Sequence, residues 1–134
     1  MHHRLFVTLS APADATSEAV RCRVHARLLA DDSFCGPGGR FGSPLCDWFV
    51  LGGRWSGCLT AADPGPRDRF ADLGAEDDAV PLTAGLLDTL LAPYLGVAEH
   101  RDGPWGCEYA DLDGDPLTRD AVGRKWLAVV DYHN

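Results

Sequence analysis

The chain begins and ends with its most strand-like segments. Residues 4–10 read RLFVTLS, a short run of β-branched and aromatic residues that stops at Ala11-Pro12, and residues 125–134 read KWLAVVDYHN, which is apolar almost throughout. Near-continuous apolar character is typical of a strand that is covered on both faces. We therefore expect the first and last strands to lie in the middle of one sheet.

Two helices are expected between these strands. The first spans about 17–29, after Asp14 or Thr16 as N-cap, and the second falls within 81–96, after Thr83 as N-cap. Their apolar positions repeat at helical spacing. The stripes are Val20, Val24 and Leu28, then Cys22, Ala26 and Leu29 in the first helix, and Leu86, Leu87, Leu90 and Leu91 in the second.

The order strand, helix, hairpin, helix, strand indicates an α+β fold. We expect a ferredoxin-like sandwich or a relative of it, with one mainly antiparallel sheet and helices on one face. The length of 134 residues fits a single domain over 1–134. In this arrangement the opposite face of the sheet stays open.

The stretch CDWFVLGGRWSG, residues 46–57, carries a Gly-Gly pair between two extended runs. Both central positions of a type I′ turn need positive φ, which glycine adopts readily, so Gly52-Gly53 predicts a hairpin in which Leu51 faces Arg54. A glycine bulge would instead shift the register and exchange the faces of one strand. In the hairpin register the face expected to pack on the helices consists of Cys46, Trp48, Val50, Trp55 and Leu59. The other face consists of Asp47, Phe49, Leu51, Arg54, Ser56 and Cys58.

The second face of this predicted hairpin combines charged and polar groups with an aromatic ring, as a ligand site does. Arg54 is expected to hold an anion, with Phe49 stacking on a ring and Ser56 adding a hydroxyl. Arg40, in a glycine-rich loop, is a further anion-binding candidate. The alternative is that Asp47 and Arg54 form only an exposed ion pair, which contributes at most about 1 kcal/mol.

The last strand places Asp131 and His133 on one face. A carboxylate beside an imidazole can fix the tautomer of the ring for acid–base work, or can present a metal ligand. Together with Asp47, these two residues form the predicted catalytic group. The alternative is a solvated histidine at a strand end. His2 and His3, at the start of the chain, receive no predicted role.

Composition limits the possible partners. Twelve basic and twenty acidic side chains give a net charge of -8, so the chain as a whole repels nucleic acid and anionic membranes. The sequence shows neither a membrane-spanning segment nor a convincing signal peptide, and we expect a cytoplasmic protein.

No metal site is predicted, and no cofactor is identified. The five cysteines lack paired metal-type spacing, which favours reduced and mostly buried thiols. The segment DLDGDP at 111–116 departs from a calcium loop, because Gly114 is at its fourth position and Val122 at its twelfth.

Two segments resemble a known pattern. A loosely defined group of uncharacterised phage and bacterial proteins carries a W-D-W-Y-x-x-G-G-R-W-x-G stretch and ends on a strand with V-V-D-x-H. The present chain is similar through GGRW at 52–55 and VVDYH at 129–133, with Cys46 and Phe49 in place of a tryptophan and the tyrosine. The resemblance supplies no activity. It implies a shared fold and a shared site around Asp47, Arg54, Asp131 and His133.

These observations predict a small cytoplasmic protein that binds a small anionic, nucleotide-like ligand on the open sheet face around Arg54, with catalysis left open. One alternative is a phage- or defence-related interaction module whose acidic loops, at 63–78 and 102–120, bind a basic partner protein. Another is that the open face forms a homodimer interface. Neither a membrane nor nucleic acid is an expected partner.

Overall fold

The computed structural model describes residues 2–12, 14–31, 34, 46–60, 71–102 and 106–134. The strands are β1 (His2–Ser10), β2 (Trp48–Leu51), β3 (Ala79–Pro81), β4 (Glu99–Asp102), β5 (Gly106–Asp111) and β6 (Lys125–His133). The helices are α1 (Ser17–Ala30) and α2 (Ala84–Leu86), and α2 continues through a π-helical turn (Leu87–Leu91) into a 3-10 turn (Ala92–Tyr94). Two further 3-10 turns are η2 (Glu76–Asp78) and η5 (Arg119–Ala121).

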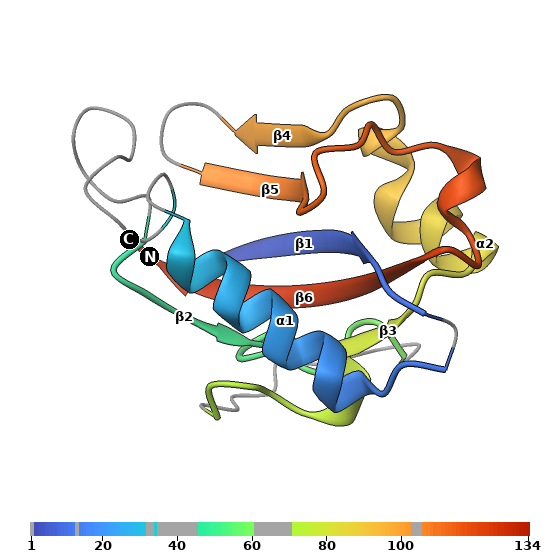
Figure 1. Ribbon diagram of the computed structural model, residues 1–134. Helices are drawn as coiled ribbons and strands as arrows, with labels where there is room; N and C mark the ends of the chain where they lie inside the picture. Colours follow the sequence, from blue (N-terminus) through green and yellow to red (C-terminus); the bar gives the residue numbers. More distant parts are fainter. Residues whose placement is uncertain (1, 13, 32–33, 35–45, 61–70, 103–105) are drawn as a thin grey trace.

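The fold is α+β, with a mixed and mainly antiparallel sheet of six strands (Figure 1). The strand order is β2-β6-β1-β5-β4, and β3 pairs with β6 outside this path. β1 runs antiparallel to β6 along its whole length and parallel to β5. The first and last strands are therefore central, as predicted, and their pairing brings the two chain ends together. This strand order does not by itself establish the ferredoxin-like arrangement.

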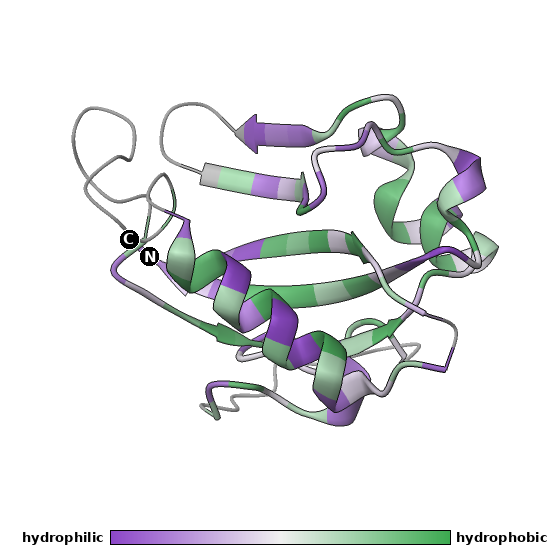
Figure 2. Cartoon of the chain, in the orientation of Figure 1, coloured by the Kyte–Doolittle hydropathy of each residue, from purple (hydrophilic) through white to green (hydrophobic). Residues whose placement is uncertain are grey.

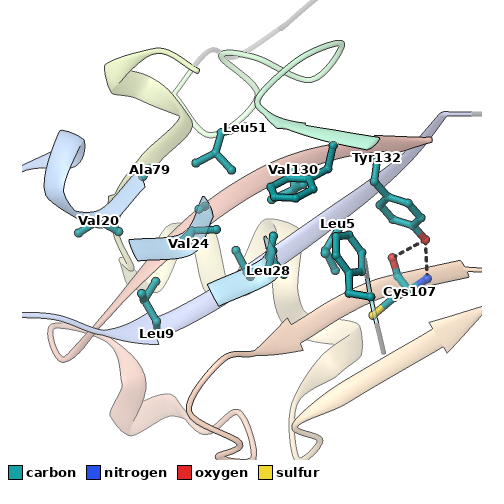
Figure 3. Close-up of a cluster of buried hydrophobic side chains, with 14 of the residues drawn as sticks. Leu5, Leu9, Val20, Val24, Leu28, Leu51, Ala79, Cys107, Val130 and Tyr132 are labelled. Carbon is teal, nitrogen blue, oxygen red and sulfur yellow. Dashed lines mark hydrogen bonds between the residues drawn. The ribbon is translucent and has the colours of Figure 1, made fainter. Parts of the chain in front are cut away.

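One face of the sheet packs against α1. The helix begins after Thr16, whose side chain accepts a hydrogen bond from the Ala19 N–H, and it buries the predicted stripe of Val20, Val24 and Leu28. These side chains meet Leu5, Leu9, Leu51, Ala79, Val130 and Tyr132 in one apolar cluster (Figure 3). The second predicted stripe does not pack inward, because Cys22 and Leu29 are exposed.

The opposite face of the sheet is covered by α2, so the expectation of helices on one face is wrong. Thr83 caps α2 as predicted, and Leu87 and Leu91 are fully buried against the sheet. This second cluster consists of Phe6, Leu59, Leu82, Leu87, Leu91, Tyr109, Leu117, Ala121, Leu127 and Val129. Two covered faces explain why the middles of β1 and β6 are hydrophobic while β4, at the sheet edge, is hydrophilic (Figure 2).

The predicted hairpin at Gly52-Gly53 is wrong. Residues 52–60 form successive tight turns, in which the Trp55 N–H donates to the Gly52 carbonyl and the Cys58 N–H to the Trp55 carbonyl. β2 pairs with β6 instead of with the segment that follows it. Glycine was correctly expected at positive φ, but here that conformation starts a series of turns rather than a second strand.

Pairing with β6 also reverses the predicted faces of β2. Phe49 lies opposite Tyr132, and both pack in the cluster beneath α1. Trp48 and Val50 lie on the other face, opposite His133 and Asp131. Trp48, which was expected in the core, is 38% exposed.

Within the described parts of the chain, none of the helices has the length and apolar character needed to cross a bilayer.

Candidate functional site

The Gly-Gly pair passes between two buried carboxylates. Gly52 has φ +74° and Gly53 has φ +53°. A Cβ atom on Gly52 would lie 2.2 Å from Asp78 Oδ2, and one on Gly53 would lie 2.4 Å from Asp131 Oδ2. Glycine suits these positions for two reasons: both have positive φ, and a Cβ at either would meet a carboxylate.

Asp78 organises the turns that follow the pair. Its side chain is fully buried and accepts hydrogen bonds from Ser56 Oγ at 3.0 Å, from the Gly57 N–H at 3.0 Å and from the Ala75 N–H at 2.8 Å. A buried carboxylate needs such partners, because it has lost its hydration. Asp78 therefore holds residues 52–57 against the segment that leads into β3.

Asp131 performs the same role on the other side and also reaches a histidine. It is fully buried, its Oδ2 accepts from the Arg54 N–H at 3.0 Å, and its Oδ1 is 2.9 Å from His2 Nδ1. A carboxylate can only accept a hydrogen bond, so Nδ1 carries the proton. Nε2 of the neutral ring is then the acceptor.

Three aromatic side chains lie in one row across β2, β6 and β1. Trp48 pairs with His133, and His133 pairs with His2, so all three project from the same face. The Trp48 and His133 rings are stacked, with centroids 5.5 Å apart, and the His2 ring meets the Trp48 ring edge-on at 5.3 Å. His133 Nδ1 is 3.2 Å from Asp47 Oδ2.

Two arginines flank this row. Arg4 lies opposite Asp131 in the next row of the same face, and its guanidinium carbon is 4.6 Å from the centroid of the Phe6 ring. Arg54 is anchored by its backbone to Asp131, and its side chain is exposed. Among the residues that the structure describes, no carboxylate forms an ion pair with either guanidinium.

We call this region the corner site. It consists of His2, Arg4, Asp47, Trp48, Arg54, Asp131 and His133. The site can supply aromatic surface, positive charge and two imidazoles that each contact a carboxylate, on the sheet face that α2 covers elsewhere.

The structure brings four of the predicted site residues together: Asp47, Arg54, Asp131 and His133. Two predictions need correction. Phe49 is buried beneath α1 because β2 pairs with β6, so its ring is not available for stacking on a ligand. Ser56 is fully buried because it donates to Asp78. Arg40 lies outside the described residues.

Sequence reasoning missed His2, Arg4 and the position of Trp48 in this site. The available signal was the strand character of both chain ends. If β1 and β6 pair antiparallel over their full length, His2 must lie beside His133 on the same face. Asp78 was missed for another reason, since nothing near it in sequence indicates which loop it binds.

An acidic cluster lies near the end of β6 that is opposite the corner site. Asp111, Asp113 and Asp115 present carboxylate oxygens within 4.8 Å of one another. The Lys125 ammonium lies 2.6 Å from Asp111 Oδ2 and 3.0 Å from Asp115 Oδ2. The ammonium thus pairs with carboxylates of the cluster, among which Asp115 remains 60% exposed.

Two of the described thiols, Cys58 and Cys107, have raised pKa values. Burial raises the pKa of Cys58 to about 11, although Arg4 lowers it, and burial raises the pKa of Cys107 to about 12. Cys46 and Cys107 are buried, as predicted, whereas Cys22 is exposed.

Comparison of the chain with family models, with curated proteins and with solved structures finds no match.

Proposed function

We propose that the chain binds a small anionic ligand carrying an aromatic ring, such as a nucleotide, in the corner site. The observation that supports this most is that His2, His133 and the partly exposed Trp48 form one row of a sheet face, with Arg4 in the next row and the Arg54 backbone bound to Asp131, in a chain of net charge -8. A local basic group on an acidic protein selects anions that are small enough to avoid the surrounding negative field. Trp48 offers a surface on which a base can stack.

The proposal differs from the sequence prediction in the identity of the stacking residue. Trp48 replaces Phe49, because Trp48 lies on the face that carries the arginines and histidines. Asp47 and Asp131 act on the imidazoles rather than on the ligand, since each carboxylate contacts a histidine ring nitrogen. The resemblance to the phage and bacterial group is consistent with this location of the site.

Thermal unfolding with AMP, adenosine and inorganic phosphate tests the proposal. AMP at about 100 times its Kd should stabilise the folded chain by about 2.7 kcal/mol. Arg54→Ala should remove the effect of phosphate and weaken that of AMP, and Trp48→Ala should weaken AMP and adenosine only. Arg124→Ala is the matched control, because Arg124 is exposed and directly precedes the first residue of β6, at the end of the strand opposite the corner site. If none of the three compounds stabilises the wild-type chain, the proposal is wrong.

A groove beside β3 favours a second candidate function, binding of a basic partner. It has a volume of about 730 Å³, and Glu76 and Asp77 line it together with Val80, Pro81 and Trp126. Carboxylates around an apolar floor fit a segment with lysine or arginine beside an apolar side chain. Glu76→Gln should then weaken binding of a lysine-rich peptide, while Arg54→Ala should leave that binding unchanged.

A further inference from the structure

His2 is fixed in the corner site from two directions. Its Nδ1 donates to the buried Asp131 at 2.9 Å, and the edge of its ring lies against Trp48. The His2 side chain is 20% exposed whereas Asp131 is fully buried. A buried carboxylate that binds Nδ1 fixes both the orientation and the tautomer of an imidazole and leaves Nε2 as the atom that can transfer a proton.

His133 also contacts a carboxylate through Nδ1, but this carboxylate, Asp47, is exposed. Its Nδ1 is 3.2 Å from Asp47 Oδ2, and its side chain is 33% exposed. The centroids of the His2 and His133 rings are 5.5 Å apart. The two partly exposed rings are therefore neighbours on one face of the sheet, close enough for one bound group to contact both.

Two imidazoles at this separation suit reactions that need a base and an acid at once. A neutral imidazole accepts a proton at Nε2, and a protonated one donates a proton from Nε2. Histidine is the side chain that serves most often as a general acid or a general base in enzymes. Hydrolysis of a phosphodiester requires this combination, because a water must lose a proton while the leaving oxygen gains one.

We propose that His2 and His133 are a general acid–base pair that hydrolyses a small phosphodiester held in the corner site; this rests on the anion binding proposed above. One imidazole takes a proton from water as the water oxygen bonds to phosphorus. The bond from phosphorus to the leaving oxygen breaks, and the other imidazole gives that oxygen its proton. The products are a phosphomonoester and an alcohol, and the proton taken from water restores the pair by exchange with solvent.

The surrounding residues define the substrate class. Arg4 and Arg54 can bind the phosphate oxygens and stabilise the charge that develops on them. Trp48 favours a substrate with an aromatic ring next to the phosphodiester. The net charge of -8 disfavours a long polyanion, so the expected substrates are cyclic nucleotides and dinucleotides rather than nucleic acid strands.

The nucleophile is water rather than a cysteine. Burial raises the pKa of the Cys58 thiol to about 11, although the positive charge of Arg4 lowers it. A thiol with such a pKa is almost entirely protonated at neutral pH and is a poor nucleophile. Asp131 and Asp47 are positioning residues, because each acts through a histidine.

Hydrolysis of bis(4-nitrophenyl) phosphate and of 2′,3′-cyclic AMP by the full chain tests the inference. We expect turnover with a bell-shaped pH dependence. His2→Gln and His133→Gln should each lower kcat/KM by about 100-fold or more and remove one limb of the pH profile, a loss much larger than any weakening of AMP binding. Asp47→Asn should change the pH profile with a smaller loss, since Asp47 is exposed and its replacement leaves the fold intact.

His3→Gln is the matched control. His3 adjoins His2 in sequence but stacks on Tyr132 on the other face of the sheet and contacts Asn134, so its replacement should leave hydrolysis unchanged. If the chain binds AMP but hydrolyses neither probe faster than buffer, or if His2→Gln retains wild-type activity, the acid–base pair is refuted and the binding function stands. If nothing binds, both proposals fail.

Discussion

Gly53 lies where a single added carbon atom should destabilise the folded chain. Gly53→Ala would place a Cβ 2.4 Å from Asp131 Oδ2 in a residue at φ +53°. We expect a loss of at least about 3 kcal/mol in the free energy of unfolding, because the clash adds to the backbone strain. Urea denaturation measures this loss.

Gly114→Ala is the control for that substitution. Gly114 has φ +80°, but a Cβ there would meet nothing within 4 Å. Its replacement should therefore cost only the backbone strain, about 1 kcal/mol. Equal losses in the two variants would show that the close approach to Asp131 is unimportant.

Thiol reactivity is a second prediction at the residue scale. In a Cys35→Ser background, we expect Cys22 to react quickly with Ellman's reagent in the folded protein at pH 7.5, because it is exposed on α1. Cys58 and Cys107 should react only on unfolding, since burial raises their pKa values to about 11 and about 12. The number of thiols that react before and after addition of guanidinium checks this. Fast reaction of Cys107 in the folded protein would contradict its burial.

At the residue scale the sequence identified part of the corner site. Asp131 and His133 could be placed on one face because the period of a strand fixes it. The expected pairing of Asp131 with His133 was wrong, because Asp131 contacts His2 and His133 contacts Asp47 instead. Phe49 was misplaced, because the face of a short strand depends on its partner, and nothing in residues 46–57 indicates that the partner is β6.

At the scale of elements, α1 offers a direct comparison between neighbouring residues. Leu28→Ala should lower the free energy of unfolding by about 2–5 kcal/mol, because Leu28 is buried in the cluster beneath the helix. Leu29→Ala should change it by less than about 0.5 kcal/mol, because Leu29 is 62% exposed. Thermal or urea unfolding of the two variants distinguishes these expectations, and similar losses would mean that the helix is rotated from its described position.

The elements were predicted unequally well for a physical reason. Both helices were located, because capping residues and apolar spacing are local signals at Thr16 and Thr83. The hairpin failed because Gly-Gly is compatible both with a two-residue turn and with a series of turns. The choice between them is made by Asp78, which binds Ser56 and Gly57 from more than twenty positions further along the chain.

At the scale of the whole molecule, Lys125 links stability to pH. Burial disfavours its ammonium, but hydrogen bonds to Asp111 and Asp115 outweigh burial and raise the pKa of Lys125. Burial likewise opposes ionisation of Asp113, but the Ser10 N–H and Lys125 outweigh it and lower the pKa of Asp113. The Asp113 carboxylate thus stabilises the fold above its unfolded pKa near 3.9, and this contribution is lost as pH falls through the lower pKa of the folded state. The Lys125 ammonium stabilises the fold below its unfolded pKa of about 10.4, and this contribution is lost as pH rises through the higher pKa of the folded state.

Lys125→Met should accordingly cost about 3 kcal/mol at pH 7, because it removes the cation that contacts all three carboxylates and leaves only Arg27, 4.0 Å from Asp113, beside them. The cost should shrink as pH falls through the folded pKa of Asp113, since protonation removes part of the repulsion. Urea denaturation at pH 7 and pH 3 measures both effects. Arg119→Met is the control, because it removes only an exposed ion pair with Asp88 and should cost less than about 1 kcal/mol.

The overall arrangement was only partly predictable. The α+β class and the central place of the first and last strands followed from their apolar character. Coverage of both faces did not, because the apolar leucines of α2 specify that the helix packs on a sheet but not on which face of it. The corner site depends on this outcome, since it occupies the end of that face which α2 leaves uncovered.

The passage of Gly52 and Gly53 between Asp78 and Asp131 has an evolutionary consequence. Each glycine is constrained by a carboxylate distant from it in sequence, so the residues should change in pairs. A lineage that acquires a side chain at position 52 is expected to carry a smaller residue at 78, and one that changes position 53 to carry a smaller residue at 131. A set of related sequences would reveal this as covariation between 52 and 78 and between 53 and 131.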